Sequence, residues 1–126
     1  MRFLGIDYGE KRVGIALSSE DNRFAFPKKV LPNDAKLVPW IKTFCRENKV
    51  GGIVLGESKD FKGKHNLIMK GVLRLKEKLA KQLEIPVYLE PEFMTSQEAA
   101  RIAGDNELLD ASAAALILQS YLDKQR

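Results

Sequence analysis

The chain has little of several features that mark common protein classes. It has a single cysteine, Cys45, so no disulfide can form within the chain, and the apolar run around it indicates a buried, unreactive thiol. No stretch approaches the roughly 20 apolar residues that a membrane-spanning helix needs, and the N-terminus lacks the pattern of a secretion signal. We therefore expect a cytoplasmic protein that does not bind a membrane.

The overall composition is typical of a soluble globular protein. The 126 residues are 44% hydrophobic and 30% charged, which suits one compact domain over residues 1–126. No internal repeat, low-complexity tract or linker divides the sequence. The net charge of +4 and the pI near 9.2 are mild evidence for an anionic partner such as a nucleic acid.

Alternating and continuous apolar patterns predict five strands. Residues 2–7 and 12–18 form a hairpin, and residues 24–31 form a third antiparallel strand that Pro27 places at an edge. Residues 51–56 and 87–89 are strands entered through crossovers. The sequence therefore predicts an α/β protein with a mixed five-stranded sheet, three antiparallel strands followed by two crossover strands, flanked by helices.

Helical spacing and capping signals predict four helices. The first follows Asp34, a candidate cap, and runs toward residue 48, with regular turns delayed by Pro39 until about Leu37. The others cover residues 68–83, 95–103 and 107–124. The second of the four buries one stripe of residues at helical spacing, namely Ile68, Val72, Leu75, Leu79 and Leu83.

Three acids stand out by their placement. Asp7 ends the first strand just before Gly9, Glu92 follows the fifth strand, and Asp110 lies near the start of the last helix. If the first strand is central, acids at the carboxyl ends of neighbouring strands can converge with one from a flanking helix. Mg²⁺ and Mn²⁺ prefer such oxygen ligands, which makes metal-assisted phosphodiester hydrolysis our hypothesis.

Each of these acids also has an ordinary structural interpretation, and spacing alone cannot bring them together. Asp7 can stabilise its own turn, Glu92 can be a solvated loop acid, and Asp110 can satisfy amides at a helix start. Neighbouring acids compete for the same roles, namely Asp105 and Glu107 with Asp110, and Glu90 with Glu92.

Basic side chains gather around the second predicted helix. They lie on its polar face and in the segment before it, and include Lys59, Lys62, Lys64, Lys70, Arg74, Lys78 and Lys81. A solvated charged face is their ordinary explanation. The alternative is that they follow a phosphate backbone, where each neutralised phosphate adds salt-sensitive affinity.

The opening Gly5-Ile6-Asp7-Tyr8-Gly9, followed by Lys11-Arg12, Gly14 and Ala16, resembles the first motif of the YqgF family. This family is also called RuvX, and comprises Holliday-junction-resolvase-like proteins, described as pre-16S rRNA nucleases, with an RNase H-like fold. The similarity extends over essentially the whole chain. Residues 53–56 resemble the fourth strand of the family, residues 86–95 its strand-and-acid motif, and residues 110–122 its terminal helix.

The resemblance implies a divalent-metal nuclease that acts on structured nucleic acid and trims the 5′ side of the 16S rRNA precursor. Resolution of branched DNA junctions is the older inference from the fold. By position, Asp7, Glu92 and Asp110 would be the catalytic, metal-binding carboxylates. Lys11 and Arg12 would contact phosphate near the cut.

The chain departs from the family pattern at two places. The usual Asp-Glu-Arg is Pro91-Glu92-Phe93 here, which removes one acid and one guanidinium. A catalytically weakened RNA-binding factor for ribosome assembly or transcription is therefore the second hypothesis. Glu57 stands where the family usually has an apolar residue before proline, so it is either a further metal ligand or a solvated acid.

Two further points stay open. The Gly-Ile-Asp-Tyr-Gly hairpin could cradle a nucleotide phosphate as in actin-like ATPases, but such enzymes need two lobes, so this alternative ranks last. The alanine-rich last helix can pack inward or against a second copy, so the sequence does not separate a monomer from a homodimer.

Overall fold

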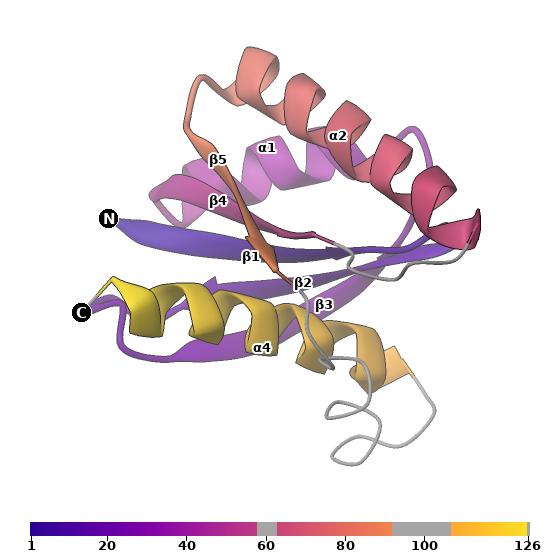
Figure 1. The fold of residues 1–126 in the computed structure, drawn as a ribbon. Coiled ribbons are helices and arrows are strands. Elements are labelled where there is room, and N and C mark those ends of the chain that lie inside the picture. The colour runs from indigo at the N-terminus through magenta and orange to yellow at the C-terminus, as the bar shows by residue number, and fades with distance from the viewer. Residues whose placement is uncertain (58–62, 92–106, 126) are drawn as a thin grey trace.

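The computed structural model describes residues 1–57, 63–91 and 107–125, with their side chains except those of residues 57, 63–68, 91 and 107–110. A five-stranded sheet in the order β3-β2-β1-β4-β5 forms the middle layer. Its strands are β1 Arg2–Tyr8, β2 Arg12–Ser18, β3 Ala25–Pro32, β4 Val50–Glu57 and β5 Val87–Pro91. Helices α1 Leu37–Glu47 and α2 Gly63–Leu83 cover one face, and α4 Glu107–Lys124 covers the other (Figure 1).

The predicted mixed sheet is confirmed. The strands β1, β2 and β3 are antiparallel neighbours, whereas β4 runs parallel to β1 and β5 runs parallel to β4. The strand β3 lies at an edge, where Pro27 removes no hydrogen bond from an inner ladder. The pairing of β2 with β3 shifts register beside Pro27, which is typical of a bulge at an edge.

Each face of the sheet buries its own apolar cluster. On the α1 and α2 side the cluster includes Leu4, Ile6 and Leu79, all fully buried. On the α4 side it includes Val54, Ala114 and Leu118, also fully buried. Because β1 and β4 lie between the two clusters, their side chains are buried on both faces, as the continuous apolar run of β4 predicted.

The helix boundaries correct two predictions. The helix α1 does begin at Leu37, but its N-cap is Lys36, and no side chain caps it. Asp34 instead shapes the turn before the helix, because its Oδ1 accepts a hydrogen bond from the Lys36 amide at 2.9 Å and its carbonyl accepts one from Leu37 at 3.1 Å. The helix α2 begins at Gly63, earlier than its apolar stripe indicated. The predicted helix 95–103 lies outside the described residues.

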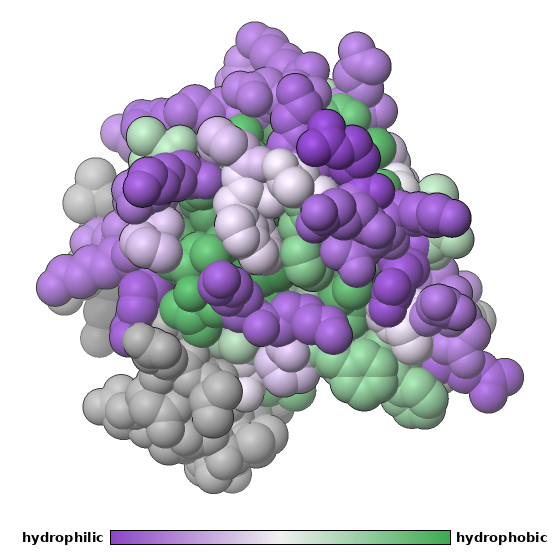
Figure 2. Space-filling view, turned by 180° about the vertical axis from the view of Figure 1, so that it is seen from behind, coloured by the Kyte–Doolittle hydropathy of each residue, from purple (hydrophilic) through white to green (hydrophobic). Residues whose placement is uncertain are grey.

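No helix in the described part of the chain is long and apolar enough to cross a membrane. Figure 2 shows the molecule from behind as mostly hydrophilic, with a hydrophobic patch at the lower right.

Candidate active site

Asp7 is the last acid on the central strand and the best-placed of the predicted site residues. It lies one residue before the end of β1 and pairs in register with Gly14 of β2. Side chains alternate along a strand, so Asp7 shares a face with Phe3 and Gly5, the face that α4 covers. It is half-buried. The hairpin therefore holds one carboxylate at the carboxyl edge of the sheet, partly shielded from water.

The helix α4 runs antiparallel to β1 and lies against it (Figure 1). Near the start of β1, the rings of Phe3 and Tyr121 are 5.5 Å apart. Further along, a Cβ on Gly5 would lie 2.7 Å from the Leu118 Cβ and 2.9 Å from the Ala114 carbonyl oxygen. A step of two strand residues covers roughly 6.6 Å, and four helix residues cover roughly 6 Å. Continuing these steps by two residues along β1, from Gly5 to Asp7, places Asp7 opposite the first turns of α4.

The other predicted ligands are only partly described. Asp110 lies in the first turn of α4 and Glu57 is the last residue of β4, opposite Pro91 of β5. Because β1, β4 and β5 are parallel, their carboxyl ends share one edge of the sheet. The side chains of Asp110 and Glu57, and all of Glu92, lie outside what the structure describes.

Within the described side chains, no group of three or more His, Cys, Asp or Glu residues could hold a metal ion. Of the four predicted ligands, only Asp7 has a described side chain. The donor set itself, four carboxylates, fits Mg²⁺ or Mn²⁺ rather than a softer metal, which would favour cysteine or histidine.

The hairpin tip that follows Asp7 is held rigidly by Asn33. The Asn33 side-chain amide donates to the Gly9 carbonyl at 2.8 Å, and its backbone amide donates to the Lys11 carbonyl at 2.9 Å. Gly9 has no room for a side chain, because a Cβ there would lie 2.6 Å from the Arg12 carbonyl oxygen. Lys11 and Arg12 are consequently presented to solvent from an ordered turn.

Three lysines before and at the start of α2 were predicted to contact phosphate, and the structure describes none of their side chains. Lys59 and Lys62 lie outside the described residues, and Lys64 lies in α2 with an undescribed side chain. The cations further along the helix, Lys70 and Arg74 among them, are exposed.

Glu90 has a structural role that sequence reasoning missed. Only 3% of the residue is exposed, and its Oε2 accepts hydrogen bonds from the Ser120 hydroxyl at 2.7 Å and the Lys124 ammonium at 2.6 Å. These contacts tie the C-terminal half of α4 to β5. The spacing of Ser120 and Lys124, one helical turn apart, was the available signal.

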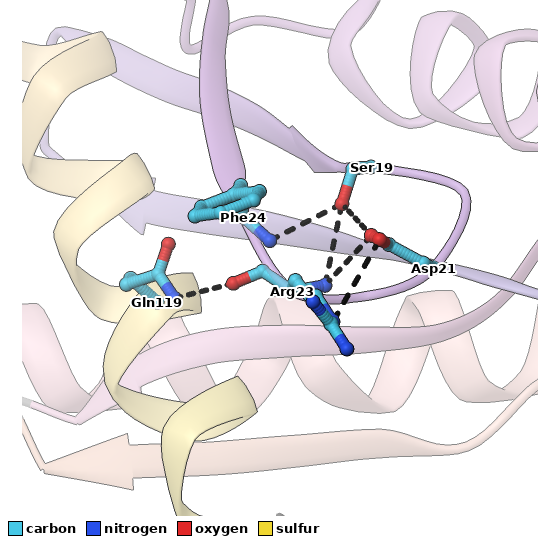
Figure 3. A network of polar contacts seen from close by, with 5 residues as sticks. All are labelled: Ser19, Asp21, Arg23, Phe24 and Gln119. Atoms are coloured by element: carbon cyan, nitrogen blue, oxygen red, sulfur yellow. Dashed lines mark hydrogen bonds and ion pairs between the residues drawn. The ribbon is translucent and has the colours of Figure 1, made fainter.

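A second polar network holds the turn between β2 and β3, at the opposite end of the sheet from Asp7 (Figure 3). The Ser19 hydroxyl donates to Asp21 at 2.6 Å, and the Arg23 amide donates to Asp21 at 3.2 Å. These hydrogen bonds lower the pKa of Asp21, and the one from Ser19 has the larger effect. The Gln119 side chain of α4 joins the network by donating to the Arg23 carbonyl at 2.8 Å and accepting from the Ala25 amide at 2.9 Å.

The sheet order, the crossover helices and the acid on the central strand together define an RNase H-like nuclease fold. The family model of RuvX, described as a Holliday junction resolvase, matches residues 1–124. The chain therefore belongs to the RuvX family, as its motifs indicated, and is a nuclease by family.

Curated relatives match over nearly their whole length. The chain is 31% identical to a protein of Maridesulfovibrio salexigens, over 97% of this chain and 98% of the relative, and that protein is named "Putative pre-16S rRNA nuclease". A protein of Thermoanaerobacter pseudethanolicus with the same name is 32% identical, over 100% and 99% of the two chains.

Solved structures share the fold at low sequence identity. Thermus thermophilus RuvC in complex with a Holliday junction substrate matches with a TM-score of 0.66 and 15% identity, over 99% of this chain and 95% of that one. The fowlpox virus resolvase in complex with Holliday junction DNA matches with a TM-score of 0.59 and 10% identity, over 99% of each chain. At these identities the likeness shows the fold alone.

Proposed function

We propose that this protein is a divalent-metal-dependent nuclease that hydrolyses phosphodiester bonds at the 5′ side of the 16S rRNA precursor, in the cytoplasm. The observation that carries the proposal is Asp7, a half-buried acid at the carboxyl end of the central strand of an RNase H-like sheet. The names of the curated relatives support the choice of substrate.

The proposed site contains Asp7, Glu92 and Asp110 as catalytic carboxylates and metal ligands, with Glu57 as a further candidate. Support comes from the shared carboxyl edge of β1, β4 and β5 and from the course of α4 toward Asp7. A bound Mg²⁺ or Mn²⁺ would supply an activated water and stabilise the leaving oxygen.

The chain's own residues would position the substrate. Asp7 would hold its carboxylate at the reacting phosphate from a strand that packing fixes on both faces. Lys11 and Arg12, on the turn that Asn33 holds, would bind phosphate beside the cut. A turn whose backbone is fixed in advance loses little backbone freedom on binding, which favours orientation of the phosphate by the side chains on it. We further propose that residues 1–126 form one nuclease domain.

The test is cleavage of an end-labelled 16S precursor fragment by purified protein with Mg²⁺, with Mn²⁺ and with chelator. We expect cleavage with either metal and none with chelator. Asp7→Asn should lose cleavage yet keep its melting temperature and RNA affinity. The matched control is Asp21→Asn, which makes the same chemical change on an exposed acid at the other end of the sheet. Equal cleavage by wild type and Asp7→Asn would remove Asp7 from the mechanism.

One observation favours a second candidate, an RNA-binding factor for ribosome assembly or transcription with weakened catalysis. Pro91 occupies the last position of β5, paired with Glu57, where the family usually has aspartate. This candidate predicts salt-dependent RNA binding without metal-dependent cleavage. Metal-dependent turnover that Asp7→Asn abolishes would exclude it. A four-way DNA junction assayed in parallel distinguishes a resolvase from an RNA-processing enzyme.

A further inference from the structure

The face of the sheet opposite α4 carries a cleft beside the proposed active site. It has a volume of about 300 Å³ and lies between the end of β1, the turn before α1 and the middle of α2. Its lining includes Tyr8, Asn33, Asp34, Leu37, Arg74 and Lys78. Tyr8 directly follows Asp7 in β1, and successive strand residues face opposite sides of a sheet. The cleft and the catalytic acid are thus on opposite faces of the same strand end.

Close packing of α2 on Tyr8 forms the inner wall of this cleft. Gly71 has no side chain, and a Cβ there would lie 2.6 Å from both Cε1 and Cζ of the Tyr8 ring. The ring therefore passes directly under the helix. The outer wall is the turn at Asp34, whose carboxylate is engaged by the Lys36 amide at 2.9 Å. Both walls are fixed by contacts within the protein.

The charge that lines the cleft is net positive, because Arg74 and Lys78 outnumber the one acid, Asp34. Within the described part of the chain, Arg74 and Lys78 make no hydrogen bond or ion pair. Lys81, one turn further along α2 and outside the cleft, pairs with Glu77 at 3.2 Å. Unpaired cations at a cleft are a site for an anion.

From this arrangement we propose that the cleft binds the phosphates of a single-stranded segment of the nucleic-acid substrate, away from the scissile bond. The inference rests on the proposed nuclease function. Arg74 and Lys78 are one turn apart, about 6 Å along the helix, so they can contact neighbouring phosphates of one strand. A cleft of about 300 Å³ between two helices has room for about one nucleotide, and none for a duplex.

The same placement gives the path of the strand. From the scissile bond at Asp7, the strand crosses the carboxyl edge of the sheet past the hairpin tip. It then enters the cleft at Tyr8. Lys11 lies on the exposed tip of that hairpin, between the two faces. The cleft therefore selects substrates in which a single strand continues from the cleavage site.

The experiment measures binding alone, in the Asp7→Asn background and with chelator, so that it does not depend on cleavage. The probes are a fluorescent RNA duplex with a single-stranded tail, the same duplex without a tail, and a version with a deoxyribose tail. The variant is Arg74→Ala/Lys78→Ala. The matched control is Lys42→Ala/Lys81→Ala, which removes the same charge from exposed positions of α1 and α2 outside this cleft.

We expect the Arg74/Lys78 variant to bind the tailed duplex about tenfold more weakly, and the blunt duplex as before. Its slope of log affinity against log salt on the tailed probe should fall by about 1.4, the contribution of two single-strand phosphates. Ala35→Phe, which narrows the cleft without changing charge, should also weaken only the tailed probe. Equal loss on ribose and deoxyribose tails would assign recognition to phosphate, and loss on the ribose tail alone would assign it to RNA.

Other results overturn the inference. An equal loss in the Lys42/Lys81 control, or an equal loss on the blunt duplex, would show general attraction to a basic surface instead of a cleft. If wild type cleaves the precursor with metal while the Arg74/Lys78 variant binds every probe normally, the cleft fails and the nuclease function stands. If the protein binds no probe at all, the proposed function fails with it.

Discussion

Replacing Gly5 with alanine tests the contact that positions α4 over the central strand. The new Cβ would lie 2.7 Å from the Leu118 Cβ and 2.9 Å from the Ala114 carbonyl oxygen. Neither atom can rotate away, because one is fixed to the helix backbone and the other belongs to it. Truncating Leu118 to alanine gives no relief, since its Cβ remains. The helix must shift away from β1 to accommodate the methyl group.

The expected cost follows from two opposing terms. Overpacking a core by a methyl group costs about 1–3 kcal/mol, while replacing glycine by alanine within a strand gains roughly 0.5–1 kcal/mol. We expect Gly5→Ala to lower the free energy of unfolding by about 1–2 kcal/mol. For a chain of this size that corresponds to a melting temperature about 4–8 °C lower.

Gly51→Ala is the matched control, because it makes the same change in the neighbouring strand β4. The atoms nearest to its Cβ would all belong to the side chain of Met1, which is 76% exposed and can move into solvent. Its stability should be unchanged or slightly higher. Urea unfolding followed by the fluorescence of Trp40, the only tryptophan, measures both variants. If the two variants are equally stable, the inference that α4 packs against β1 too closely for a side chain at Gly5 is wrong.

Three other changes have defined outcomes. Cys45 should resist alkylation in the folded protein and react in urea, because burial raises the pKa of its thiol to about 12; stability should fall as pH rises from near 9 toward 12, since the unfolded thiol loses its proton first. Lys124→Ala should cost about 1–3 kcal/mol in urea unfolding, because it removes the cation from buried Glu90. Gln119→Ala should speed amide hydrogen exchange at Ala25, which loses its acceptor.

Each of these predictions has its own control. Lys81→Ala breaks an ion pair whose side chains are 75% and 69% exposed, so it should change stability by less than about 1 kcal/mol; a similar loss for Lys124→Ala would mean that Glu90 does not need its cation. Unchanged exchange at the Ala25 amide would exclude Gln119 as its acceptor. Rapid alkylation of native Cys45 would contradict its burial.

The sheet was predictable from sequence because its signals are local. Two short apolar stretches flank the turn at Tyr8 to Lys11, and the apolar run at 51–56 has the character of a strand buried on both faces. The strands and their antiparallel or crossover connections therefore followed from pattern, whereas their order in the sheet did not. The start of α1 was harder to assign. Asp34 is a residue type that often caps helices, but it lies two residues before the N-cap position, which Lys36 occupies. Its carboxylate accepts a hydrogen bond within the turn that precedes the helix.

The site was predictable in part. The position of Asp7 follows from its strand, but that α4 approaches this strand is a long-range packing fact that depends on Gly5 and Leu118. Sequence spacing also gave Glu90 and Glu92 similar claims to a catalytic role. Burial separates them, because Glu90 is already bound by Ser120 and Lys124.

A helix packs closely against each face of the strand β1, and each of the two contacts depends on a glycine. This packing fixes the position of the strand end that carries Asp7. On one face Gly5 lets α4 approach the backbone, and on the other Gly71 of α2 lies over the Tyr8 ring. Asp7 lies between these two contacts, so its position follows the packing of both helices. A substituent at either glycine should therefore move Asp7 relative to its neighbours. Gly71→Ala should consequently alter cleavage and single-strand binding together, whereas Gly5→Ala should reduce cleavage while the cleft on the opposite face still binds.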